Sequence, residues 1–214
     1  MQRIEFLNYG TGAYVSDPLW GVRIDGTDLR TSVAEATREL WRQEHEEDTP
    51  AEQERFLLGQ HNGLITSELG DPVRHFLGDP GPEFADAATG RTPVLGCSCG
   101  VWGCWPLVAV ITATPHTVTW SSFRQPFRAE WGELALGPYV FDRTAYESAL
   151  AAPVRLGEDP LRAGDEEDGD DGADEDWEDW DGEDWHGDSY GDSDGASEGS
   201  SDGASDGPSP GSSG

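Results

Sequence analysis

The alternation of apolar and polar residues predicts several short strands. Residues 20–29 alternate around an Asp-Gly dipeptide, which is typical of a two-residue turn, so this segment predicts a β-hairpin. Residues 92–95 are short and apolar, and residues 106–114 form a longer apolar run of strand length. Residues 116–123 alternate again. The short link between the last two segments predicts an antiparallel hairpin.

Two helices are predicted in the first third of the chain. Residues 32–47 carry apolar side chains at helical spacing, and Ser32 and Glu35 have the spacing of a capping box at the start. A second helix is predicted from Thr49, which is followed by a proline at the first helical position and by a second capping-box partner, Glu52. A glycine at position 59 is a typical helix end.

A third helix is predicted over residues 143–151. Asp142 precedes it as an N-cap, and Phe141 and Tyr146 have the spacing of a hydrophobic staple. Residues 60–91 give no clear pattern. Together these elements predict an α+β fold, in which a small antiparallel β-meander is flanked by two or three helices.

The C-terminal quarter differs sharply in composition from the rest. Residues 163–214 contain 20 of the 43 acidic residues, no Arg, and no Val, Ile, Leu, Met or Phe. Such a segment cannot bury enough apolar surface to offset the entropy of ordering it. We therefore expect one globular domain over residues 1–162, followed by a disordered acidic tail rich in Gly, Ser and Asp over residues 163–214.

The strongly negative net charge limits the kinds of partner that the protein can bind. The net charge is −30, with 13 Arg and no Lys. Binding to nucleic acid, or to an anionic membrane surface, requires clustered cations, so neither partner is expected. A basic protein that docks on the acidic tail is the favoured partner. The absence of Lys also excludes Schiff-base chemistry and the lysine of a P-loop.

The N-terminal residues point to a cytoplasmic protein. The sequence MQRIEFLNYG lacks the cationic start and apolar run of a signal peptide, and no stretch reaches the length of about 20 apolar residues that spans a bilayer. In the cytoplasm, cysteines stay reduced, so a structural disulfide is not expected.

The most unusual feature is a cysteine-rich turn between two predicted strands. All three cysteines of the chain, Cys97, Cys99 and Cys104, lie within eight residues among glycines. In the simplest interpretation they are small buried side chains that fill a tight turn. Alternatively, three thiolates converge on one Zn²⁺, because glycine lets the backbone fold back beneath the ligands. Thiol-redox chemistry is a third interpretation.

A structural zinc site needs a fourth ligand, and the chain offers few. His116 lies at the far end of the next predicted strand, which would carry it roughly 30 Å from the turn. His61 or His75 would reach the turn only through the tertiary fold. The second Cys or His pair of the common two-knuckle zinc pattern is missing from the sequence.

No complete catalytic motif occurs. Ser98 stands in a G-x-S-x-G pattern, but the residues after it do not begin a helix, as a nucleophile elbow requires. His45 and Glu46 lack the second histidine of a zincin motif. We therefore expect a non-enzymatic interaction or binding domain, with zinc binding or thiol-redox chemistry at Cys97, Cys99 and Cys104 as the alternative.

Three segments together resemble a family of small bacterial proteins of the actinobacterial type. They are the CxCGxxGCWPL turn within residues 94–107, residues 118–123, and the LGPxxFDRxxYExAL segment at residues 136–150. The resemblance is specific over residues 92–151 and loose over residues 20–58. It implies a single cytosolic α+β domain. The family has no established activity or cofactor, so no functional residue carries over from it.

Overall fold

The computed structural model describes residues 1–10, 17–81, 90–99 and 103–161. They belong to the first of two compact units, Met1–Asp170, and the second unit, Asp171–Gly214, lies outside the described residues together with the predicted tail. The described residues form an α+β fold with four α-helices and two five-stranded sheets. The expectation of an α+β fold is therefore confirmed, whereas the predicted disorder of the tail stays a prediction.

One sheet is built around the N-terminal strand. Its strand order is β10-β1-β2-β3, and β5 also pairs with β2. All pairings are antiparallel except the parallel pairing of β1 with β10. The strands are β1 (Ile4–Tyr9), β2 (Leu19–Ile24), β3 (Thr27–Asp28), β5 (Leu64–Ile65) and β10 (Val154–Leu156).

The second sheet contains the predicted meander. Its order is β4-β6-β7-β8-β9, and every pairing in it is antiparallel. The predicted hairpin of residues 106–123 is confirmed as β7 and β8. The strands are β4 (His61–Asn62), β6 (Thr92–Cys97), β7 (Leu107–Ala113), β8 (Thr117–Arg124) and β9 (Tyr139–Asp142).

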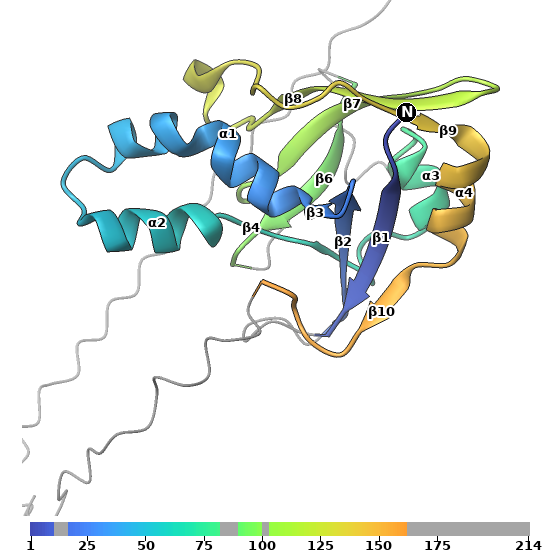
Figure 1. Cartoon of the computed structure of the whole chain (residues 1–214), viewed down its shortest axis with the longest axis horizontal. Helices are drawn as coiled ribbons and strands as arrows, with labels where there is room; N and C mark the ends of the chain where they lie inside the picture. The colour runs from blue at the N-terminus through green and yellow to red at the C-terminus, as the bar shows by residue number, and fades with distance from the viewer. Residues whose placement is uncertain (11–16, 82–89, 100–102, 162–214) are drawn as a thin grey trace, which may run out of the picture. The chain divides into compact units, whose positions relative to one another are not determined.

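The four helices are α1 (Leu29–Glu44), α2 (Pro50–Leu58), α3 (Pro72–Phe76) and α4 (Arg143–Ala151), and one 3₁₀ turn, η1, covers Ala129–Trp131. Helices α1 and α2 lie side by side as a helical hairpin, and α3 and α4 lie against each other near β9 (Figure 1). The predicted caps of α2 and α4 are confirmed. Thr49 forms a complete capping box with Glu52, and the Asp142 carboxylate accepts a hydrogen bond from the Ala145 amide.

The helix predicted from residue 32 begins at Leu29, and its N-cap lies four residues before the predicted one. Asp28, not Ser32, is the N-cap, because the Asp28 carboxylate accepts a hydrogen bond from the backbone N–H of Arg30. The same carboxylate accepts two bonds from the Arg30 guanidinium, which also binds both oxygens of Asp159 at 2.8 Å. All three side chains are buried. This ion-pair triad joins the start of α1 to the segment after β10.

An aromatic cluster connects the two sheets. Phe6 of β1 lies 4.9 Å from Phe76 of α3 and 5.3 Å from Tyr146 of α4, measured between ring centroids. Phe76 also stacks on Trp120 of β8. The Tyr146 hydroxyl accepts a hydrogen bond from the Trp120 indole and donates one to the Phe76 carbonyl. These rings are almost completely buried, so the two sheets share one core.

A glycine lets the chain pass from one sheet to the other between β4 and β5. A Cβ atom on Gly63 would stand 2.5 Å from the carbonyl oxygen of Trp20, so only glycine fits this position. The Gly63 amide donates a hydrogen bond to the Tyr9 hydroxyl. This close crossing places β4 beside the end of β6, and β4 carries His61.

Among the described residues, none of the helices combines the length and apolar character that crossing a bilayer requires.

Candidate functional site

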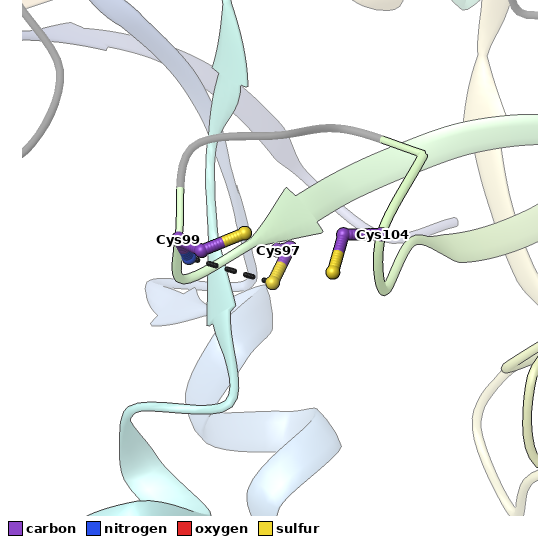
Figure 2. Close-up of side chains that lie close together, drawn as sticks. All are labelled: Cys97, Cys99 and Cys104. Atoms are coloured by element: carbon purple, nitrogen blue, oxygen red, sulfur yellow. Dashed lines mark hydrogen bonds between the residues drawn. The ribbon is translucent and has the colours of Figure 1, made fainter. Parts of the chain in front are cut away.

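The three cysteines come together at the end of the β6–β7 hairpin. Cys97 is the last residue of β6, and Cys104 stands just before β7 begins, so the antiparallel pairing of the two strands brings both residues to one end of the sheet. Their Sγ atoms and that of Cys99 all lie within 4.8 Å of one another. Figure 2 shows the three sulfur atoms gathered between the end of β6 and the turn that leads to β7.

The cysteines differ in exposure. Cys97 is buried, whereas Cys99 and Cys104 are exposed, and none of the three is in a disulfide. The simplest prediction, that all three fill a tight turn as buried apolar side chains, is therefore wrong for Cys99 and Cys104. A thiol that stands in solvent contributes little to packing.

Hydrogen bonds fix the first part of the turn. The Cys99 backbone N–H donates to the Cys97 sulfur at 3.4 Å (Figure 2), and the Asn62 side-chain amide donates to the Ser98 carbonyl at 3.0 Å. Asn62 pairs with Gly96 across the β4–β6 ladder. The turn is thus supported from the neighbouring strand. N–H donors to a ligand sulfur are among the outer contacts that orient and tune thiolate ligands.

Burial raises the pKa of the Cys97 thiol to about 11, although the N–H of Cys99 acts in the opposite direction by favouring the thiolate. A thiol of this kind is a poor nucleophile near neutral pH, because the thiolate is the reactive form. Cys97 therefore does not resemble an activated cysteine.

His61 is the histidine that the fold brings to the turn. It lies directly opposite Cys97 in the β4–β6 pairing. However, its two ring nitrogens have other contacts: Nδ1 lies 3.2 Å from the Gly96 carbonyl, and Nε2 lies 2.7 Å from the Gln125 side-chain amide. Burial lowers the pKa of His61 to about 4, so the ring is neutral at neutral pH.

The other two histidines considered as ligands lie elsewhere. His75 on α3 bonds through Nε2 to the Pro93 carbonyl at 2.7 Å, and His116 is exposed between β7 and β8. Across the described ranges, the cysteine trio is the group of three His, Cys, Asp or Glu side chains with converging ligand atoms, and no imidazole or carboxylate joins it.

A buried polar chain, which the sequence does not predict, supports both ends of the turn. The Gln125 amide donates to His61, and its carbonyl accepts from Arg128, which is paired with Glu44 at 2.6 Å. The Arg128 guanidinium also stands 3.7 Å from the centre of the Trp105 ring. His61 thus holds Gly96, next to Cys97, and Arg128 holds Trp105, next to Cys104.

Arg128 owes its position to an aromatic enclosure. Besides Trp105, the rings of Trp131 and Trp41 lie 4.2 Å and 4.8 Å from the guanidinium. Cation–π contacts of this kind are strongest when the cation is removed from water, and Arg128 is 6% exposed. Trp131 and Trp41 are buried side chains of the core.

Comparison of the chain with protein-family models, with curated proteins and with solved structures gives no match.

Proposed function

We propose that this protein is a non-enzymatic binding protein whose turn at Cys97, Cys99 and Cys104 holds one thiophilic metal ion, with Zn²⁺ as the first ion to test. The observation that carries the proposal is the convergence of the three Sγ atoms within 4.8 Å. Three thiol groups on a supported turn are the donor set that soft and borderline metal ions prefer.

The spacing of the sulfur atoms suits a single ion. In a tetrahedral zinc site with Zn–S distances of about 2.3 Å, the sulfur atoms lie about 3.8 Å apart. The observed spacing of up to 4.8 Å is wider, and rotation of the exposed Cys99 and Cys104 side chains would close it. Cys97, fixed at the end of β6, supplies the anchored ligand. Water, or a ligand from a partner, would take the fourth position.

Metal analysis of protein purified without added zinc tests the proposal. We expect about one equivalent of bound metal, which is lost on replacing a ligand, as in Cys104→Ser. Ser98→Ala is the matched control, because it lies in the same turn and contributes its backbone carbonyl, not its side chain, to the described contacts. Only trace metal in the purified protein, together with no uptake from zinc-buffered solution, would rule the site out.

Thiol-redox chemistry is the less favoured alternative at the same residues, because burial raises the pKa of Cys97. Fast alkylation of Cys97 near neutral pH, in the metal-free protein, would favour the redox function over metal binding.

A second binding role is supported by composition alone. The predicted acidic tail carries a charge of −20, which attracts a basic protein partner over a distance that shortens as salt is added. We expect the full-length protein to bind a polyarginine peptide at low salt. A variant with its tail Asp and Glu changed to Asn and Gln should bind much more weakly, and equal binding by both would refute this role.

A further inference from the structure

The cysteine site offers three protein ligands and an open side. Cys99 and Cys104 are exposed, whereas Cys97 is buried, and the Cys97 side chain lies between the other two in Figure 2. In the part of the chain that the structure describes, no carboxylate or imidazole approaches the three sulfur atoms closely enough to join them. An ion that requires four ligands would have to take the fourth from outside these residues.

His61 is badly placed to become that fourth ligand. Its ring is buried, and its two nitrogens contact the Gly96 carbonyl and the Gln125 amide. Turning the ring towards the sulfur atoms would break both contacts inside the core. It would also remove the support of the strand that carries Cys97, since His61 holds the adjacent carbonyl. The geometry therefore favours an ion for which three ligands are sufficient.

We propose that the Cys97, Cys99 and Cys104 site binds trivalent arsenic, taken up as arsenite, in a three-coordinate complex. This inference rests on the proposed function, because it uses the same three side chains as one binding site. Trivalent arsenic forms three bonds to sulfur, and its lone pair occupies the fourth direction. It therefore needs no fourth protein ligand.

The reaction balances without any redox partner. Arsenite enters as As(OH)₃, three As–O bonds break, and three As–S bonds form with the three thiols. Each thiol proton leaves with one hydroxide, so three water molecules are released and arsenic stays trivalent. A small neutral molecule can reach the two exposed cysteines first and then bond to Cys97.

The charge of the product also favours a trivalent centre. Three thiolates around Zn²⁺ leave one negative charge on the site, in a chain whose net charge is already −30 and which contains no Lys. Three thiolates around As(III) form a neutral group. Adding negative charge to a strongly acidic protein is opposed by self-repulsion, whereas forming a neutral group is not.

Titration of the reduced, full-length protein with sodium arsenite tests this inference. We expect one arsenic per chain, seen in native mass spectrometry as the mass of arsenic less three hydrogens, and protection of all three thiols from a thiol reagent. Cys99→Ser and Cys104→Ser should each weaken binding by an order of magnitude or more. Both residues are exposed, so their replacement should preserve the fold, which circular dichroism checks. Ser98→Ala should bind like the parent.

A parallel titration with Zn²⁺ separates this inference from the proposed function. Zinc binding through the three cysteines without any arsenite binding would overturn the arsenite inference and leave the metal site standing. Failure of both ions to bind would overturn both. An arsenic adduct that protects only two thiols, or that survives unchanged in Cys99→Ser and Cys104→Ser, would also overturn the three-coordinate site.

Discussion

Replacing Arg30 with methionine should destabilise the fold severely, because it leaves two buried carboxylates without their counter-ion. Arg30 donates two side-chain hydrogen bonds to Asp28 and two to Asp159, at 2.8 to 3.0 Å. The side chains of Asp28 and Asp159 are only 7% and 3% exposed, so water cannot replace the lost partner. Methionine has a similar length, so the substitution removes charge and hydrogen bonds more than volume.

The size of the destabilisation depends on the hydrogen bonds that Asp28 and Asp159 keep after Arg30 is replaced. Removing one partner of a buried ion pair costs about 3–5 kcal/mol, and here a second carboxylate is stranded as well. Asp28 keeps its bond from the Arg30 backbone N–H, and Asp159 keeps one from the Leu161 N–H, which limits the loss. We therefore expect Arg30→Met to cost about 4–6 kcal/mol, much of the total stability of about 5–15 kcal/mol that is typical of a domain.

Two further variants, both expected to destabilise the fold less, serve as comparisons for Arg30→Met. Asp159→Asn leaves Arg30 paired with Asp28 and should cost about 1–3 kcal/mol, as expected for the loss of charge-assisted hydrogen bonds. Arg74→Met is the matched control, because it removes an Arg–Asp pair in which Arg74 and Asp79 are 66% and 67% exposed. An exposed pair of this kind contributes little to stability, because solvent screens the two charges.

Urea unfolding followed by far-UV circular dichroism measures these differences. Circular dichroism is preferable to fluorescence, because three of the nine Trp lie within the predicted tail. A cost for Arg30→Met no larger than that for Arg74→Met would refute the argument.

Two other substitutions test local features of the fold. Tyr146→Phe removes the hydroxyl that contacts both the Trp120 indole and the Phe76 carbonyl, so we expect a loss of about 1–3 kcal/mol in the free energy of unfolding; an unchanged urea midpoint would contradict this. Thr49→Ala removes the α2 capping box and should cost about 1 kcal/mol in the same assay. A Thr49→Ser variant, which keeps the hydroxyl, should recover most of that loss.

The elements that the sequence predicts well are fixed by neighbours in the chain. Thr49 and Glu52 form their capping box within four residues, and Asp142 caps α4 three residues ahead. In the predicted hairpin of residues 20–29, Asp25 and Gly26 both adopt the positive φ angles of the expected turn. In each case, the contact that decides the structure joins residues that are close in sequence.

The elements that the sequence does not predict depend on distant contacts. The N-cap of α1 is Asp28, and its carboxylate is bound by the Arg30 side chain. Arg30 in turn binds Asp159, which lies 129 residues further along the chain. Strands β4 and β5 have two residues each, too few for an alternation to be seen. Strand β10 is largely exposed, and its pairing with β1 determines its conformation.

The candidate site also combines a local feature, which the sequence indicates, with distant contacts, which it does not. The sequence offers convergence of Cys97, Cys99 and Cys104 as one of three interpretations, and their Sγ atoms do lie close together, because a hairpin turn is a local feature. The support around them is not local. His61 and Arg128 reach the two ends of the turn through the tertiary fold, and neither stands in a motif that marks it as part of a site.

The parallel pairing of β1 with β10 bears on how the protein is made. Strand β1 leaves the ribosome long before its outer neighbour, Val154–Leu156, which is the last of the described strands. Throughout translation of the intervening chain, one edge of β1 keeps its N–H and C=O groups unpaired, and such an edge invites association with other chains. A nascent polypeptide halted before Val154 would therefore be the form most in need of a chaperone.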